Sequence, residues 1–107
     1  MREGAKELGL QVFITEMDVN DREWPAPEEI RDKVVADCYG SFLDTALADA
    51  SVHAVLTWGI TDRATWLNSE GARKDALQER CLPFDRDGKP KKAFFAIRNS
   101  FDKRRMV

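Results

Sequence analysis

The 107-residue chain has little of several features that mark common functional classes. Its net charge is −2, with 17 Lys and Arg residues against 19 Asp and Glu residues, whereas a nucleic-acid-binding domain carries a clear basic excess. Its apolar runs are far shorter than the roughly 20 residues that span a bilayer. The first residues are too polar to resemble a signal peptide. We therefore expect no nucleic-acid partner and no membrane partner.

Motifs for metals, disulfides and nucleotides are also scarce. The chain has two cysteines, one histidine and no Cys-x-x-C pair, which does not make up a zinc site. Cys38 falls on an apolar helix face and Cys81 stands beside Leu82, so two free, mostly buried thiols are favoured over a bridge. No glycine-rich phosphate-binding motif follows either predicted strand. We expect no metal and no organic cofactor.

The hydrophobic pattern predicts an α/β protein. Residues 10–15 and 52–58 are nearly continuously apolar and rich in branched and aromatic side chains, which is typical of strands buried on both faces. Apolar residues that recur every four positions predict a long helix over 27–50, and a shorter helix is predicted over 1–8. Pro90 opens a last helix. Strands separated by a full helix run parallel, so the sequence predicts a βαβ unit.

The same periodicity predicts which helix positions face the strands. In the long helix one row of apolar residues repeats every four positions, and a second row widens it. The predicted core positions are Ile30, Val34, Cys38 and Phe42, widened by Val35, Tyr39, Leu43 and Leu47, and then Phe94, Ile97 and Phe101 in the last helix.

Two carboxylates follow the first predicted strand. In parallel α/β folds, sites form at the carboxyl ends of the strands, where a carboxylate is costly unless it is paired or used. Glu16 and Asp18 point to the same side if the strand alternates regularly. Two like charges on one face would share donors, a proton or a substrate. Spacing alone leaves open the alternative of a rim carboxylate bonded to a neighbouring loop.

Tryptophans follow the second predicted strand. Sugar rings present apolar C–H faces that pack on aromatic rings, while their hydroxyls need carboxylate and guanidinium partners. Trp58 and Trp66, beside Glu16, Asp62 and Arg63, therefore suit a carbohydrate cleft. The alternative is that Trp58 belongs to the core and Trp66 anchors a loop.

Three segments together resemble glycoside hydrolase family 10, the endo-β-1,4-xylanases. Ile-Thr-Glu-Met-Asp-Val at 14–19 resembles the strand that carries the nucleophile. The segment 57–67, with its Trp-Gly-x-x-Asp-x-x-x-Trp block, resembles the last strand and the loop after it. The segments 82–85 and 87–94 resemble the approach to the final helix, although Lys92 stands where the family usually has proline. In this order the segments extend over most of the chain, from residue 14 to residue 94.

This resemblance implies the C-terminal part of a (β/α)8 TIM barrel. Residues 1–107 would form a partial family 10 catalytic domain, made of the end of helix 6, strand 7, helix 7, strand 8 and helix 8. Glu16 would be the catalytic nucleophile, and Asp18 a carboxylate that orients the site. Trp58 and Trp66 would be substrate-binding walls around the sugar next to the scissile bond.

The resemblance also implies that part of the enzyme lies outside this chain. A retaining glycosidase uses two carboxyl groups. In this family the acid/base follows an Asn, and no Asn-Glu pair occurs here. A complete barrel takes roughly 250 residues. The missing N-terminal barrel portion is therefore an expected partner, and we expect the isolated chain to be inactive.

The function implied is hydrolysis of internal β-1,4-xylosidic bonds in xylan by a retaining double displacement. Xylan or xylo-oligosaccharides would be the substrate, and this chain would supply the nucleophile part of the site. Because xylan lies outside the cell, the parent enzyme is expected to be secreted or extracytoplasmic. Two alternatives stay open: a non-catalytic carbohydrate-binding piece, and a structural fragment that works only by assembling with a partner.

Overall fold

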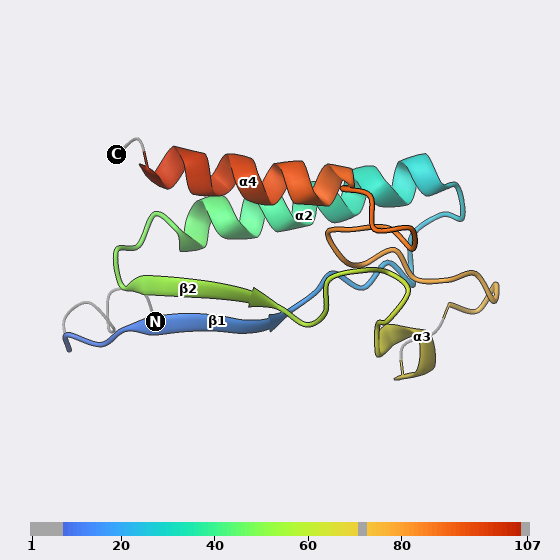
Figure 1. The fold of residues 1–107 in the computed structure, drawn as a ribbon, viewed down its shortest axis with the longest axis horizontal. Coiled ribbons are helices and arrows are strands. Elements are labelled where there is room, and N and C mark those ends of the chain that lie inside the picture. The colour runs from blue at the N-terminus through green and yellow to red at the C-terminus, as the bar shows by residue number, and fades with distance from the viewer. Residues whose placement is uncertain (1–7, 71–72, 106–107) are drawn as a thin grey trace.

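A computed structural model describes residues 8–70 and 73–105 of the chain. The elements follow in the order β1 (Val12–Met17), α2 (Glu28–Ala46), β2 (Val52–Thr57), α3 (Leu67–Glu70) and α4 (Lys92–Arg105). The two strands pair in parallel, and the two long helices lie side by side on one side of them (Figure 1). The predicted βαβ unit is confirmed. The helix predicted over 1–8 falls almost wholly outside the described residues.

The core lies between the sheet and the helices. Leu43 and Leu47 of α2 are buried against Val52 of β2, and partly buried residues of β1 pack around them. A second cluster joins Tyr39 of α2 to Ala93 of α4. Full burial of one such aliphatic side chain stabilises the fold by about 1.5–3 kcal/mol.

No helix in the described part of the chain is long and apolar enough to cross a membrane.

Helix α2 begins as expected and ends earlier than expected. Pro27 precedes it, and its first turn carries acidic residues, which the positive end of the helix dipole favours. The helix ends at Ala46, whereas the sequence predicted about four more residues. Asp49 accounts for the difference, because its side chain accepts a hydrogen bond from the Ser51 N–H at 2.8 Å and its own N–H donates to Ala46 O at 3.1 Å. Such local bonds compete with helical ones.

The predicted packing face of α2 is wrong in part. The buried residues of the helix are Arg31, Val35, Ala36, Tyr39 and Leu43. The neighbouring row is open: Phe42 is 51% exposed, and Cys38 is exposed as well. The physical reason is that two strands cover only one of the two apolar rows. Phe101 of α4, also expected inside, is likewise exposed.

The two cysteines are free, and they differ in burial. Cys81 is buried as expected, whereas Cys38 is exposed, which corrects the sequence prediction for that residue. Burial raises the pKa of the Cys81 thiol to about 12.

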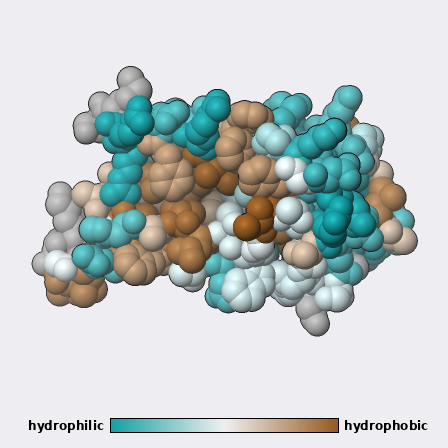
Figure 2. All heavy atoms as spheres, viewed as in Figure 1, coloured by the Kyte–Doolittle hydropathy of each residue, from teal (hydrophilic) through white to brown (hydrophobic). Residues whose placement is uncertain are grey.

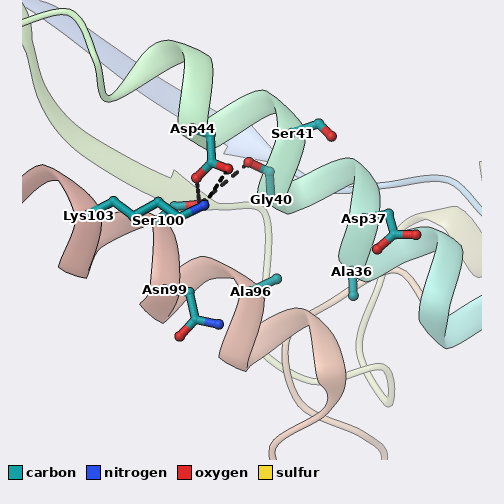
Figure 3. A pocket seen from close by; sticks show the side chains of 9 residues that line it. All are labelled: Ala36, Asp37, Gly40, Ser41, Asp44, Ala96, Asn99, Ser100 and Lys103. Atoms are coloured by element: carbon teal, nitrogen blue, oxygen red, sulfur yellow. Dashed lines mark hydrogen bonds and ion pairs between the residues drawn. The ribbon is translucent and has the colours of Figure 1, made fainter.

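Helices α2 and α4 meet through small side chains. Ala36 and Gly40 of α2 face Ala96 and Ser100 of α4 across a groove of about 450 Å³ (Figure 3). Small residues at such a contact allow close approach of the helix axes. Asp44 closes one end of the groove, because it accepts hydrogen bonds from Ser100 Oγ at 2.7 Å and from Lys103 Nζ at 2.9 Å.

Candidate active site

Strand β1 contains a bulge at the candidate nucleophile. Between the pairs that Ile14 and Met17 make with β2, three steps along β1 match two steps along the partner strand. Glu16 has a φ of 57°, in a left-handed region that residues other than glycine seldom occupy. Bulges re-aim side chains next to active sites, and such backbone strain concentrates at functional sites. The bulge also breaks the regular alternation that the sequence prediction assumed.

Glu16, Trp58 and Trp66 line one hollow. Trp58 directly follows β2, and its N–H donates to Met17 O of β1 at 2.9 Å. Together with Trp66, Glu16 and Trp58 surround a space of about 260 Å³ at the carboxyl end of the two parallel strands. Glu16 and Trp58 therefore open onto the same end of two adjacent parallel strands.

Asp18 is connected to the same hollow through Trp66. The indole Nε1 of Trp66 donates a hydrogen bond to Asp18 Oδ2 at 2.8 Å. A hydrogen bond to an ionised carboxylate is roughly twice as strong as one between neutral groups. Asp18 therefore restrains the indole of Trp66, which lies 48 residues away in the sequence.

Neither tryptophan is a core residue. Trp58 is 49% exposed and Trp66 is 47% exposed, so neither belongs to the core. Leu67, beside Trp66, anchors that loop, since it is buried in a small cluster with Cys81 and Leu82, and the Trp66 indole ties the same loop to Asp18.

Further contacts hold the loop that carries Trp66. Thr65 Oγ1 accepts hydrogen bonds from the Leu67 N–H at 3.2 Å and from Cys81 Sγ at 3.3 Å. Gly59 turns the chain after β2 with a φ of 111°, and a Cβ at this position would lie 2.9 Å from a methyl carbon of Leu82. The turn therefore requires glycine.

Asp62 is a structural residue, which corrects the interpretation that placed it in a carbohydrate cleft. It is 1% exposed, and it accepts hydrogen bonds from Lys91 Nζ at 2.8 Å and from the Leu82 N–H at 2.9 Å. Burial raises the pKa of Asp62, although Lys91 opposes the shift. Arg63, also assigned to a cleft, is exposed and is not among the three residues that line the hollow.

A buried charged cluster beyond the end of β1 was not predicted. Asp21 and Glu79 are both fully buried. Arg31 Nη1 donates to Asp21 Oδ2 at 3.0 Å, and Arg73 Nη1 donates to Asp21 O at 2.5 Å. The Asp21 N–H donates to Glu79 Oε2 at 3.2 Å. The cluster ties the loop after β1 to a segment 58 residues away, a separation that no local sequence pattern identifies.

The two carboxyl groups of this cluster hold one proton between them. Burial and the neighbouring Asp21 raise the pKa of Glu79 to about 8. Burial also acts to raise the pKa of Asp21, but hydrogen bonds from Glu79, from the Arg80 N–H and from Arg31 hold it below its ordinary value. Near neutral pH, Glu79 is therefore protonated and Asp21 is ionised.

The part of the chain that the structure describes holds no group of three or more His, Cys, Asp or Glu residues able to bind a metal ion.

The model of glycosyl hydrolase family 10 matches residues 3–100, nearly the whole sequence. The chain belongs to glycosyl hydrolase family 10. Endo-1,4-beta-xylanase B of Thermotoga neapolitana is 34% identical over 100 residues, which is 92% of this chain and 27% of that protein. Endo-1,4-beta-xylanase A of Caldicellulosiruptor saccharolyticus is also 34% identical, over 84% of this chain and 28% of its own length.

Solved structures of family 10 xylanases resemble the fold. Xylanase 10B of Thermotoga petrophila, in complex with xylobiose, superposes with a TM-score of 0.78 at 33% identity, over 94% of this chain and 29% of that one. Native xylanase 10B of Thermotoga maritima gives a TM-score of 0.78 at 32% identity. These enzymes are (β/α)8 barrels. The chain thus corresponds to a part of one barrel and spans less than a third of the length of these relatives.

Proposed function

We propose that this chain is the C-terminal part of an endo-1,4-β-xylanase. In this assignment β1, α2, β2 and α4 are strand 7, helix 7, strand 8 and helix 8 of the barrel. The observation that carries the proposal is the hollow shared by Glu16, Trp58 and Trp66 at the carboxyl end of two parallel strands. Catalytic sites of TIM barrels lie at this end. The relatives matched over most of the chain are endo-1,4-beta-xylanases.

Glu16 is the nucleophile of a retaining mechanism. Its carboxylate attacks the anomeric carbon, the bond to the leaving sugar oxygen breaks, and a covalent glycosyl–enzyme forms. A second carboxyl group, supplied by the rest of the barrel, protonates that oxygen. It then removes a proton from the water that hydrolyses the intermediate. Neither step calls for a metal or an organic cofactor.

Trp58 and Trp66 hold the sugar beside this nucleophile. Each tryptophan residue is about half exposed, and its indole offers an apolar face on which a pyranose ring packs. Asp18 keeps the Trp66 indole in place through its 2.8 Å hydrogen bond. The xylobiose complex of the Thermotoga petrophila enzyme supports a xylo-oligosaccharide as the ligand, and an exported parent enzyme follows from the location of xylan.

A non-catalytic carbohydrate-binding role is the second candidate. It is favoured by one observation: Glu16 is the single carboxylate that lines the hollow within the described residues, whereas a retaining site needs two. This candidate requires that the isolated chain bind xylo-oligosaccharides on its own.

The decisive experiment replaces the matched part of the Thermotoga neapolitana xylanase by this chain. We expect the chimera to hydrolyse xylan and the isolated chain to show no turnover. Glu16→Ala should abolish activity in the chimera, while Glu23→Ala, an exposed acid of the loop after β1, should not. A folded but inactive chimera together with xylobiose binding by the isolated chain would favour the binding role.

A further inference from the structure

The loops beyond the strands hold a carboxyl group that the proposed catalytic steps do not use. Figure 2 shows hydrophilic side chains gathered over this end of the molecule, but Glu79 in these loops is fully buried. Its Oε2 accepts a hydrogen bond from the Asp21 N–H at 3.2 Å. Its Oε1 is buried and has no hydrogen-bond partner among the described residues. An unpartnered buried oxygen of this kind calls for a physical explanation.

The negative charge of Asp21 explains it. Burial and the neighbouring Asp21 raise the pKa of Glu79 to about 8, although Arg73 opposes the shift. Two buried carboxyl groups at one place cannot both ionise cheaply. Glu79 therefore keeps a proton near neutral pH, and that proton lies between the two carboxyl groups.

The positively charged groups around Glu79 are bonded to other acceptors. Their hydrogen bonds are those of Arg31 to Asp21, of Arg73 to Asp75 and to Asp21 O, and of Arg80 to Asp32. In the described part of the chain, none of these guanidinium groups donates to the Glu79 carboxyl group. Ionisation of Glu79 would therefore leave a second buried negative charge beside Asp21 without a cation bonded to it, which is a costly arrangement.

Glu79 also contacts the loop that carries Trp66. Its backbone N–H donates to Asn68 Oδ1 at 2.8 Å, and Asn68 stands two residues after Trp66. Trp66 in turn donates to Asp18 at 2.8 Å, three residues before Asp21. These contacts form a closed circuit, which we call the Glu79 link; its members are Asp18, Trp66, Asn68, Glu79 and Asp21.

We propose that Glu79 is a positioning residue for Trp66, and that the proton it shares with Asp21 keeps the Glu79 link closed. While the proton is present, the loop after β1 and the segment around Glu79 stay together, and Trp66 remains bonded to Asp18. Loss of the proton drives the two carboxyl groups apart, which weakens the bond to Asn68 and frees the Trp66 indole. Sugar binding in the hollow then weakens at alkaline pH; this last step rests on the proposed function, whereas the coupling of Glu79 to Trp66 does not.

A purely structural role for Glu79 predicts a different response. In that case its ionisation lowers the stability of the whole chain and leaves the Trp66–Asp18 bond intact in every molecule that is still folded. The same loops have ties without Glu79, since the Val19 N–H donates to Cys81 O at 3.3 Å and Leu67 is buried against Cys81. The structure therefore favours a local release of Trp66 over unfolding.

Nuclear magnetic resonance of the 107-residue chain between about pH 6 and about pH 10 tests the coupling. The indole N–H signal of Trp66, identified by its loss in Trp66→Phe, should move upfield with a midpoint near the pKa of Glu79, about 8. The carboxyl carbon of Glu79 should titrate with the same midpoint. The backbone N–H of Trp58, which donates to Met17 O at 2.9 Å, should stay protected and so report that the chain is folded. A Trp66 signal that does not move while Glu79 titrates would overturn the proposal.

Two matched variants separate this proton from other titrations. Glu79→Gln keeps an uncharged group of the same size and should hold the Trp66 signal at its neutral-pH position over the whole range. Glu23→Gln, at an exposed site of the loop after β1, should titrate like the parent. A Trp66 step that persists in Glu79→Gln contradicts the proposal. If Glu79→Gln does not fold, the parent decides: midpoints of Trp66 and Glu79 that differ by more than about one pH unit would exclude a common proton.

The chimera extends the test to substrate. Between about pH 7 and about pH 9.5, its KM for xylotriose should rise at least about threefold more than that of the Glu79→Gln chimera. The kcat of both should follow one pH profile, because Glu79 does not line the hollow. Equal rises in KM would overturn the effect on binding. A Trp66 step without xylan hydrolysis refutes the proposed function and leaves the positioning role intact, whereas hydrolysis with an unmoved Trp66 signal does the reverse.

Discussion

The loops beyond the strands and the layer of strands and helices differ in whether the chain itself satisfies or covers their side chains. In the loops, buried charges find partners within the chain: Asp62 binds Lys91, and Asp21 binds Arg31. In the strand–helix layer, Phe42 and Phe13 remain more than half exposed. The loops that position the candidate site therefore satisfy their buried charges within the chain, whereas the strand–helix layer beneath them leaves large apolar side chains uncovered.

The largest loss of stability is expected when a buried ion pair beyond the strands loses one partner. Lys91→Met leaves Asp62 buried without its cation, and removal of one partner of a buried ion pair costs about 3–5 kcal/mol. Urea unfolding of the 107-residue chain measures the loss. Lys33→Met is the control, because the Lys33–Asp37 pair is exposed, and it should cause no measurable change. Equal effects of the two variants would contradict the structural role given to Asp62.

Truncation of two neighbouring residues of α2 should change the stability of the isolated chain by very different amounts. Leu43 is fully buried and Phe42 is half exposed. In the isolated chain, Leu43→Ala should lower the free energy of unfolding by about 2–5 kcal/mol, while the larger truncation Phe42→Ala should change it by less than about 1 kcal/mol, as for a surface site. A larger loss for Phe42→Ala would show that Phe42 is already covered in the isolated chain.

The raised pKa of Glu79 predicts that the free energy of unfolding depends on pH. Its pKa is raised from an ordinary value of 4.5 to about 8 in the folded chain, so the folded state holds one proton more than the unfolded state between these values. The free energy of unfolding should therefore fall as the pH rises through this range, by at most roughly 1.4 kcal/mol per pH unit. Glu79→Gln should remove this slope, and Glu23→Gln, at an exposed site, should keep it. An unchanged slope in Glu79→Gln would assign the titration to another group.

The smallest effect concerns Asp18 and Trp66. Asp18→Ala removes the acceptor for the indole N–H; loss of a hydrogen bond to a charged group is worth about 1.5–3 kcal/mol when buried and less at an open site. We expect the KM of the chimera for xylo-oligosaccharides to rise several-fold. Asp18→Asn keeps an acceptor oxygen and should restore most of the affinity. If both variants bind alike and as well as the parent, Asp18 does not position Trp66.

Local sequence pattern was sufficient for the type and order of the two strands and the two long helices. Periodicity located β1, α2, β2 and α4 to within a few residues, and the Trp-Gly-x-x-Asp-x-x-x-Trp block pointed to the family. The bulge at Glu16 was not predictable, because it depends on how β1 registers against β2. The cluster of Asp21 and Glu79 was missed because its members are 58 residues apart.

The exposed row of α2 shows a different limit. Periodicity predicted Phe42 as a core position, but it could not show which of two adjacent apolar rows the strands cover. Val35 and Leu43, assigned only to widen the stripe, are the buried ones, because two strands reach no farther. The part that the sequence could not supply is therefore which of the two apolar rows is buried.

The central claim is that Glu16 is the nucleophile, and trapping the covalent intermediate tests it most directly. The chimera is incubated with an aryl xylobioside that carries fluorine at C2 of the sugar to be transferred. The activated leaving group departs without a proton, and the fluorine slows hydrolysis of the glycosyl–enzyme. Peptide mapping should then place one sugar adduct on Glu16, and none in Glu16→Ala. An adduct on any other carboxylate, or an active chimera that Glu16→Ala does not impair, would contradict the assignment.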